Sequence, residues 1–532
     1  MIEFLDEAYK PGLEDGEDHA LAALWPLGRS FVAFQARLSL PEDALIVWGD
    51  LLEEAVDPAV PVHRLRLSAP GYAFSAFRVA RVGGLGDPLL PFRSAFLRAG
   101  DALNLLFLAE TGEDPAPSAA RLTRSLSGEE GERVCEHAEL PIRPLGYTLP
   151  EPRRYQKKID LWQHNTCIAR YYGVEAYSEA HFRLMKPYFE ALSRLGQRSV
   201  TVLATHKPWD GQRRGLAGQI RPASLFEAQM VRVCREDSGL AIDFTPMDRV
   251  VALAEACGIT EEIEIFGLCG AWTARSLVAV QTKEGLAYLS EEEMEVYIDA
   301  LARHIREMGW TERTVICADE PQDEARFARE IERLRRLAPD LRLKGALDHR
   351  SFADRFGKAL HVVVPSFFTA CRRLPLLRSL PGEKTWYICC GPNKPNTFLT
   401  SPLLETRALC YLGELFGFDG LLRWAFTAWP EDPYREAAVG PWEPGDTFVV
   451  YPGRDGYPVL SLRYLQLRRM AEDQQLLCAV RDPVAYAARI FTLTDPERFE
   501  IDGWTVKGKL HTLSPCDFEA VRRAMVEELR TT

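Results

Sequence analysis

The chain has 532 residues, of which 47% are hydrophobic and 26% are charged, and its formal net charge is -12. This length predicts roughly two to four domains, and the proportions are ordinary for a globular protein in water. The negative charge argues against nucleic acids and anionic membranes as partners, because both require concentrated Lys and Arg. A small neutral or cationic molecule is compatible with it.

Targeting and cofactor signals are missing from the sequence. The first 20 residues have no basic region followed by an apolar core, and no apolar run is long enough to span a bilayer. The 12 cysteines form no CxxC pair, and the chain contains no GxGxxG or Walker-type loop. We therefore expect a cytoplasmic protein with buried free thiols, no metal and no organic cofactor, and we expect Cys389 and Cys390 to lie in a strand.

Residues 1–152 are predicted to form a β-sandwich-like domain. Short apolar segments such as SFVAFQARLSL (30–40), ALIVWGD (44–50) and ALNLLFLAE (102–110) are separated by Gly, Pro and Asp turns. The Pro-rich LPIRPLGYTLPEP (140–152) then reads as the connection to the next domain.

Residues 153–482 alternate short apolar runs with stretches of helical periodicity. The strand candidates are KIDLWQH (158–164), SVTVLATH (199–206), IEIFGLC (263–269), TVICADE (314–320), LRLKGAL (341–347), LHVVVPSF (360–367), TWYICCG (385–391) and LLRWAFTAW (421–429). Eight strands alternating with helices predict an α/β fold of the (β/α)8 TIM-barrel type, and a doubly wound open sheet is the competing architecture. Residues 461–477 are predicted to form a long amphipathic helix with Ser461 as its N-cap. Residues 483–532 are expected to form a helical or mixed C-terminal extension.

Two adjacent carboxylates, Asp319 and Glu320, end the fourth predicted strand. Pro321 stops that strand, and Phe327 and Ile331 begin the buried stripe of the following helix. Acidic residues are common at helix starts, where they favour the positive end of the helix dipole. The carboxyl ends of barrel strands, however, are also where active sites lie, so the other strand ends must decide between these two interpretations.

The other strand ends carry residues suited to a sugar. Indole faces stack on the C–H face of a sugar ring, and carboxylates and amides bind its hydroxyls, although a single Trp in a strand is more often core. The candidate substrate-binding residues are His206, Trp209, Trp272, Asp348, Tyr387, Asn396, Trp424 and Trp429, and Asn393 is expected at the same rim.

The adjacency of the two acids favours one mechanism over another. A retaining glycosidase usually places two carboxyl groups about 5 to 5.5 Å apart across the scissile bond, whereas neighbours on a strand point to opposite faces. The pair instead suits substrate-assisted catalysis, in which Glu320 protonates the leaving oxygen while Asp319 orients a 2-acetamido group. The charge of Asp319 and nearby indoles should raise the pKa of Glu320, and Asp319 should stay ionised.

Several long motifs make the chain resemble glycoside hydrolase family 123, the β-N-acetylgalactosaminidases and their relatives. The motifs are GLGDPLLP (84–91), IDLWQHNTCIARYYGVEAYSEAHF (159–182), THKPWDGQ (205–212), ADEP (318–321), WYICCGPNKPNTF (386–398) and FDGLLRWAFTAWPEDP (418–433), followed by VVYPG and SLRYLQLRRMAEDQQLL. The resemblance implies a β-sandwich followed by a (β/α)8 barrel.

The resemblance also implies release of β-linked N-acetylgalactosamine with retention through an oxazolinium intermediate. Asp319 then corresponds to the acetamido-polarising residue and Glu320 to the general acid/base, and residues 424–429 help form the pocket. Thr427 stands where relatives more often carry Asn, which is expected to remove a hydrogen bond to the sugar. The predicted function is a retaining exo-β-N-acetylhexosaminidase acting on small glycans.

Two alternatives stay open at this point. One is an ordinary retaining glycosidase on a sugar without the acetamide, with Asp348 as nucleophile. The other is a non-catalytic carbohydrate-binding protein. The galacto or gluco preference, the linkage and homo-oligomerisation are not decided by the sequence.

Overall fold

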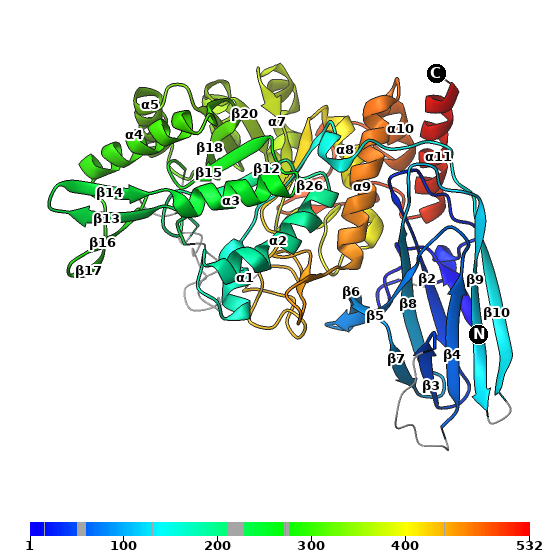
Figure 1. Cartoon of the computed structure of the whole chain (residues 1–532). Coiled ribbons are helices and arrows are strands. Elements are labelled where there is room, and N and C mark those ends of the chain that lie inside the picture. The colour runs from blue at the N-terminus through cyan, green and yellow to red at the C-terminus, as the bar shows by residue number, and fades with distance from the viewer. Residues whose placement is uncertain are drawn as a thin grey trace.

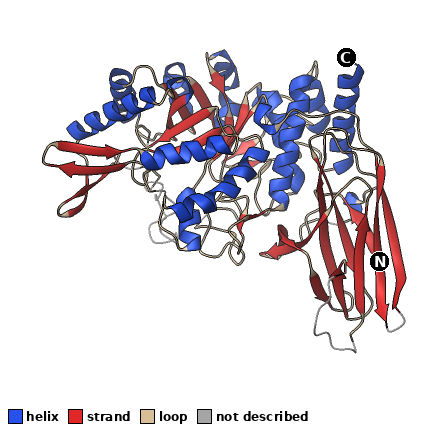
Figure 2. Ribbon diagram, viewed as in Figure 1, coloured by secondary structure: helices blue, strands red, loops and turns tan. Residues whose placement is uncertain are grey.

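The computed structural model describes residues 1–14, 16–50, 60–128, 131–209, 228–270, 272, 276–440 and 442–531. The fold is mixed α/β: strands dominate the N-terminal part, and strands alternate with helices in the remainder (Figures 1 and 2). None of the helices within these ranges has both the length and the apolar composition that crossing a bilayer requires.

The N-terminal part consists of two five-stranded sheets that share a hydrophobic core. One sheet has the order β1-β2-β8-β5-β6 and the other the order β10-β9-β4-β3-β7. Their strands are β1 (Ile2–Leu5), β2 (Phe31–Ser39), β3 (Ala44–Trp48), β4 (Val62–Ser68), β5 (Ser75–Val82), β6 (Leu85–Pro91), β7 (Ser94–Leu97), β8 (Ala102–Glu110), β9 (Ser118–Gly128) and β10 (Gly131–Ile142). Phe34 and Phe107 from the first sheet pack with Ile46, Leu65 and Leu122 from the second. The three apolar segments predicted as strands here are β2, β3 and β8.

Eight parallel strands form the centre of the remaining chain, and each lies within or overlaps one of the eight predicted segments. They are β11 (Lys158–Leu161), β12 (Ser199–Leu203), β15 (Glu262–Phe266), β18 (Thr314–Asp319), β19 (Arg342–Leu347), β20 (Val362–Pro365), β22 (Trp386–Ile388) and β23 (Gly420–Arg423). Their residues are almost all buried, as expected for parallel strands covered by helices on the outside.

The hydrogen-bonded ladder divides these strands into two sheets. One has the order β12-β15-β18-β19-β20-β21, in which the two-residue β21 (Glu383–Lys384) is a ninth parallel strand just before β22, and the other has the order β11-β23-β22. Isolated parallel bridges, Ile159 with Gln197 and Ser366 with Tyr387, connect the two sheets at both junctions. Between β11 and β12 the side chain of Gln163 accepts a hydrogen bond from the backbone N–H of Thr201, at 2.8 Å, where a continuous ladder would have a backbone acceptor.

Helices surround these strands, and several begin at the caps that the sequence supplies. They are α1 (Asn165–Tyr172), α2 (Glu179–Arg194), α3 (Thr245–Ala256), α4 (Glu291–Glu307), α5 (Glu324–Leu337), α6 (Arg350–Phe356), α7 (Phe367–Ser379) and α8 (Leu403–Phe416). Asp323 caps α5 by accepting from the backbone N–H of Arg326, which is the helix-start role that its sequence position suggested. Asp319 and Glu320 lie before that cap.

A four-stranded sheet projects from this part of the molecule (Figure 1). It contains β13 (Arg232–Glu236), β14 (Gly239–Asp243), β16 (Ala279–Thr282) and β17 (Gly285–Tyr288). Sequence reasoning missed these strands, because their segments mix charged residues and glycine with few apolar ones.

Helix α9 (Leu462–Ala479) begins at the predicted cap Ser461 but is not amphipathic. Nearly all of its residues are buried, including Arg463, Gln466 and Asp473. Arg463 is accommodated by an ion pair with Asp87 of β6, whose oxygen lies 2.8 Å from its guanidinium. The polar residues of this helix therefore contact other parts of the protein, and their polarity alone did not predict that they face solvent.

The described part of the chain closes with α10 (Pro483–Ile490), the short strands β26 (Ile501–Asp502) and β27 (Thr505–Val506), and α11 (Pro515–Thr531).

The prediction of buried thiols is wrong for Cys135, Cys234 and Cys516, which are exposed. Cys389 and Cys390 are in a bend directly after β22, not in a strand, because β22 ends at Ile388.

Candidate active site

A cavity of about 430 Å³ opens at the carboxyl ends of the parallel strands. It is lined by Trp162, Trp272, Asp319, Glu320, Gln322, Ala346, Asp348, His349, Ser366, Phe368, Tyr387, Cys389, Cys390, Gly391, Leu422, Trp424, Trp442 and Trp504. Most of these residues lie within two residues of the carboxyl end of a parallel strand, which explains why segments far apart in sequence meet here.

Asp319 is the last residue of β18 and is only 8% exposed. The indole Nε1 of Trp272 donates a hydrogen bond to its Oδ2 at 3.0 Å, and the indole of Trp209 donates a second one. Burial raises the pKa of Asp319 to about 7, and the two indole hydrogen bonds oppose that rise only in part. The expectation that this carboxyl stays ionised therefore holds only above pH 7.

Glu320 leaves the strand with a backbone φ of 45°, in the left-handed region that L residues rarely adopt. Its N–H donates to the carbonyl of Ala346 at 2.9 Å, so the pairing of β18 with β19 extends to this residue before the chain turns. The alternation of a regular strand consequently ends at Asp319, and both acids face the same cavity instead of opposite sides of a sheet. A strained backbone of this kind is typical of functional sites.

The carboxyl of Glu320 is half-buried and receives a 2.5 Å hydrogen bond from the hydroxyl of Tyr387 on β22. Burial raises the pKa of Glu320 to about 8, and the negative charges of Asp319 and Asp348 add to the rise. The Tyr387 hydrogen bond opposes it. At neutral pH Glu320 is therefore mostly protonated, as the sequence predicted, and it has a proton to donate.

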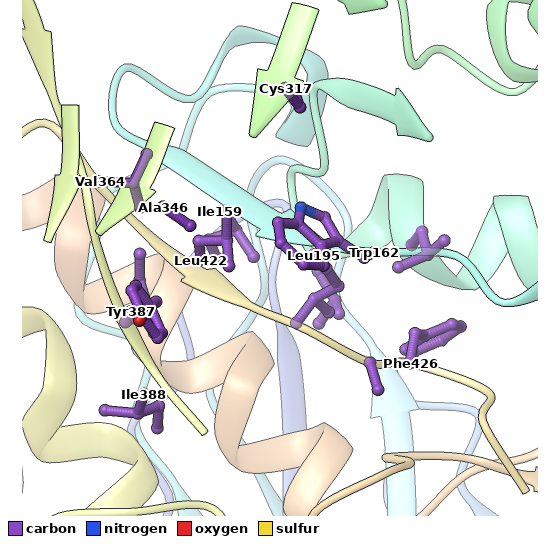
Figure 3. Packing of buried hydrophobic residues seen from close by; sticks show 14 of the residues in the cluster. Ile159, Trp162, Leu195, Cys317, Ala346, Val364, Tyr387, Ile388, Leu422 and Phe426 are labelled. Atoms are coloured by element: carbon purple, nitrogen blue, oxygen red, sulfur yellow. The ribbon is translucent and has the colours of Figure 1, made fainter. Parts of the chain in front are cut away.

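Aromatic side chains form much of the cavity wall. Trp162 is 3% exposed and stacks on Trp209, with 5.7 Å between ring centroids. Figure 3 shows Trp162 and Tyr387 within the cluster of buried hydrophobic residues, to which strands, helices and loops contribute. On another part of the wall Trp424 packs against Trp442 at 5.3 Å. Flat apolar faces beside carboxyl groups are the combination that binds sugar rings.

The structure brings five of the predicted substrate-binding residues to this site: Trp272, Asp348, Tyr387 and Trp424 line the cavity, and Trp209 donates a hydrogen bond to Asp319 without lining it. Three others do not line it. Because β23 ends at Arg423, Trp429 turns into the core, where its Nε1 donates to the carbonyl of Val450.

His206 and Asn396 are also away from the cavity. The ring of His206 packs against Tyr288 of the projecting sheet. Asn396 is fully buried, and its amide donates to the carbonyls of Cys389 and Pro392, so that it shapes the loop after β22.

Two further points concern Thr427 and the motif at 205–212. Thr427 was expected to stand where relatives hydrogen-bond the sugar through Asn. It is buried, its hydroxyl donates to the carbonyl of His164, and it does not line the cavity. Of the motif at 205–212, residues 210–212 lie outside the described residues.

Sequence reasoning missed several lining residues, namely Trp162, Gln322, His349, Phe368, Cys389, Cys390, Trp442 and Trp504. Trp162 stood within a predicted strand and Gln322 two residues after the acids, so their positions carried a signal. Trp442 and Trp504 come from segments with no strand or motif to mark them. In the part of the chain that the structure describes, no group of three or more His, Cys, Asp or Glu side chains is arranged to hold a metal ion.

Comparisons with known proteins identify a family and a shared fold. The family model "Glycoside hydrolase 123, catalytic domain" matches residues 162–480. A solved family 123 glycoside hydrolase from Clostridium perfringens is 13% identical, with a TM-score of 0.77, over 100% of this chain and 98% of that one. This likeness shows a shared fold.

Weaker structural matches include a beta-glucuronidase from an uncultured Clostridium sp., which is 10% identical with a TM-score of 0.34 over 83% of this chain and 88% of that one. A cyclomaltodextrinase is 9% identical with a TM-score of 0.34 over 86% of this chain and 83% of that one. No curated protein sequence matches the chain.

Proposed function

The chain belongs to glycoside hydrolase family 123 and is a glycoside hydrolase, and from this premise we propose that it is a retaining exo-β-N-acetylhexosaminidase that releases β-linked N-acetylgalactosamine. The observation that carries the proposal is the pair Asp319 and Glu320, which line one cavity while receiving hydrogen bonds from different partners, Trp272 and Tyr387. Two carboxyl groups with separate environments suit two separate roles.

In the proposed mechanism Asp319 accepts a hydrogen bond from the N–H of the 2-acetamido group. This contact aligns the acetamido carbonyl oxygen for attack on the anomeric carbon. Glu320 donates its proton to the glycosidic oxygen as the bond to the leaving group breaks. The attack closes an oxazolinium ring, and Glu320, now ionised, removes a proton from the water that opens the ring. The two displacements together retain the anomeric configuration.

The order of the two pKa values supports these roles. The acid needs its proton and the acetamido-orienting residue needs its charge, and Glu320 has the higher pKa, about 8 against about 7. Between these values the productive form, with Glu320 protonated and Asp319 ionised, is the most populated.

Exo action is supported by the shape of the site. Asp319 is buried and receives hydrogen bonds from two indoles, whereas Gln322 and His349, which line the same cavity, are exposed and so mark its mouth. A terminal sugar is held beside the buried Asp319, and the rest of the glycan leaves past the exposed residues.

We propose further that the two parallel sheets, joined by their single bridges, are one (β/α)8 barrel, and that the two N-terminal sheets are a β-sandwich domain. The proposed boundaries are 1–152, 153–482 and 483–532. The proposed setting is the cytoplasm, with small glycans as substrates, without a cofactor, and with neither nucleic acid nor membrane as partner. The similar Clostridium perfringens enzyme acts on glycolipid glycans, which supports a glycan substrate.

A second candidate is an ordinary retaining glycosidase in which Asp348 is the nucleophile. It is favoured by one observation: Asp348 lines the same cavity and its charge raises the pKa of Glu320. This mechanism needs no acetamido group on the sugar, so the two candidates differ in the substrates they accept.

The proposed mechanism is tested by the stereochemistry and the inhibition of the reaction together. Proton NMR of the first product formed from an aryl β-N-acetylgalactosaminide should show the β-anomer. The corresponding sugar thiazoline, which mimics the oxazolinium ring, should inhibit competitively. An α-anomer as first product, or retention without thiazoline inhibition, would contradict the substrate-assisted mechanism.

A further inference from the structure

One cavity residue, Trp504, comes from beyond the part of the chain that the family model matches. That match ends at residue 480, whereas Trp504 belongs to the C-terminal extension. It stands in the turn between the short strands β26 and β27, which pair Asp502 with Thr505. The extension therefore contributes a wall to a site that is otherwise built by the matched residues.

Trp504 differs from the other tryptophans in its exposure. The chain has 11 tryptophans, all within the described residues, and Trp504, at 61%, is the exposed one among them. Single exposed apolar residues are common on protein surfaces and need no explanation by themselves. The position of this one matters, because it lies at the edge of a cavity that contains the acid Glu320.

The backbone around Trp504 is fixed to the loop that follows β22. The N–H of Asn393 donates to the carbonyl of Trp504 at 3.1 Å, and the N–H of Val506 donates to Oδ1 of Asn393 at 2.7 Å. Nearby, a Cβ atom added at Gly391 would lie 3.1 Å from Phe368 and 3.5 Å from the Cβ of Trp504. The indole is thus held close to the cavity wall on a short anchored turn.

Asp319 and Trp504 lie in contrasting environments within the cavity. Asp319 is buried, whereas Trp504 is exposed together with Gln322 and His349. An exo-acting enzyme that holds the terminal sugar beside Asp319 directs the leaving group toward the exposed mouth. An exposed indole face stacks on a sugar ring, and the amide and imidazole at the mouth offer partners for hydroxyl groups.

We propose that Trp504 is the stacking platform of a leaving-group subsite, which binds the sugar ring attached to the anomeric oxygen of the terminal acetamido sugar. This inference rests on the proposed function and adds a substrate class to it. The preferred substrates are oligosaccharides, in which a second sugar follows the terminal one, and not glycosides of small alcohols.

The test compares two substrates of the full-length enzyme. One is a disaccharide of N-acetylgalactosamine β-linked to galactose, and the other is methyl β-N-acetylgalactosaminide, whose leaving group is too small to reach a platform. We expect Trp504→Ala to lower kcat/KM for the disaccharide about tenfold, mainly through KM, and to change the methyl glycoside less than about twofold. Trp504→Phe, which keeps an aromatic face, should recover most of the loss.

The matched control is Tyr457→Ala. Tyr457 has the same exposed fraction, 61%, but does not line the cavity, and its replacement should leave both substrates unaffected. Equal losses on the two substrates, or no loss on the disaccharide, in Trp504→Ala would overturn the subsite alone. A wild-type enzyme that hydrolyses neither substrate would overturn the proposed function and the subsite with it.

Discussion

The hydroxyl of Tyr387 donates a 2.5 Å hydrogen bond to Oε1 of Glu320, and so links the end of β22 to the carboxyl that follows β18. This bond lowers the pKa of Glu320 against the larger effect of burial, which raises it. Tyr387 therefore limits how far the pKa of the acid rises above neutrality. Its hydroxyl also orients one carboxyl oxygen, leaving the other for the proton that the reaction requires.

Replacing this tyrosine should change the pH dependence of the reaction. Without the donated hydrogen bond in Tyr387→Phe, the ionised form of Glu320 loses a partner and its pKa rises, so the alkaline limb of kcat/KM should move upward by about one pH unit. The measurement is a pH profile of wild type and variant on the same aryl glycoside. An unchanged alkaline limb would show that this hydrogen bond does not tune the acid.

The wild-type profile itself should be a narrow bell. Activity should rise as Asp319 ionises, through about pH 7, and fall as Glu320 loses its proton, through about pH 8. The optimum is therefore expected between these two values, because only there are the two required forms present together. A broad plateau from pH 5 to pH 7 would mean that Asp319 works in its protonated form or takes no part.

Conservative changes to the two acids should be severe and distinguishable. Glu320→Gln removes the proton donor and should lower kcat for glycosides with poor leaving groups by roughly two to four decades, with a smaller effect on activated aryl glycosides. Asp319→Asn should slow both kinds of substrate, because both require the acetamido group to be aligned for attack on the anomeric carbon. Steady-state kinetics on the two kinds of substrate measures the difference.

The control for these changes is Asp323→Asn. Asp323 caps α5, does not line the cavity, and Asn is an equally good cap, so activity should stay near wild type. If either acid variant kept activity comparable to this control, the corresponding role would have to be abandoned.

The buried ion pair between Arg463 and Asp87 should be important for stability. Both side chains are almost fully buried and join α9 to the N-terminal sheets. Arg463→Met leaves the carboxylate of Asp87 buried without its cation, which costs about 3 to 5 kcal/mol in comparable cases. Urea or thermal unfolding should show a clearly lower midpoint.

Lys283→Met provides the comparison for this variant. Its ion pair with Asp237 is exposed on both sides, and exposed pairs contribute about 0 to 1 kcal/mol. Similar midpoints for the two variants would mean that the Arg463 pair is not a principal contact between the N-terminal sheets and α9.

The part of the fold that could be predicted from the sequence is the part that local pattern encodes. Buried parallel strands are short continuous apolar runs, so all eight were recognisable. The place where the apolar run of β18 stops also predicted that the two acids lie at the end of that strand. The left-handed conformation of Glu320 was not recognisable, because glutamate rarely adopts a positive φ and no residue in the segment marks one. Sequence periodicity alone placed the two acids on opposite faces.

It was harder to predict from the sequence which of two similar residues in one segment lines the cavity and which lies in the core. Trp424 lines the cavity and Trp429 is core, and the difference depends on where β23 ends, which pairing with its neighbours decides. Helix α9 looked amphipathic because its polar residues were taken as exposed, whereas their partners, such as Asp87, are hundreds of residues away in sequence. Trp504 likewise reaches the site through tertiary contacts, among them the hydrogen bond from the N–H of Asn393 to its carbonyl.

The requirement for the 2-acetamido group is the most direct test of this account. The measurement compares kcat/KM for an aryl β-N-acetylgalactosaminide with that for the aryl β-galactoside, which has a hydroxyl in place of the acetamide. If Asp319 acts through that group, the acetamido substrate should be hydrolysed at least about a thousandfold more efficiently, because the galactoside lacks the internal nucleophile. Comparable rates on the two substrates would contradict substrate-assisted catalysis and point to Asp348 as nucleophile instead.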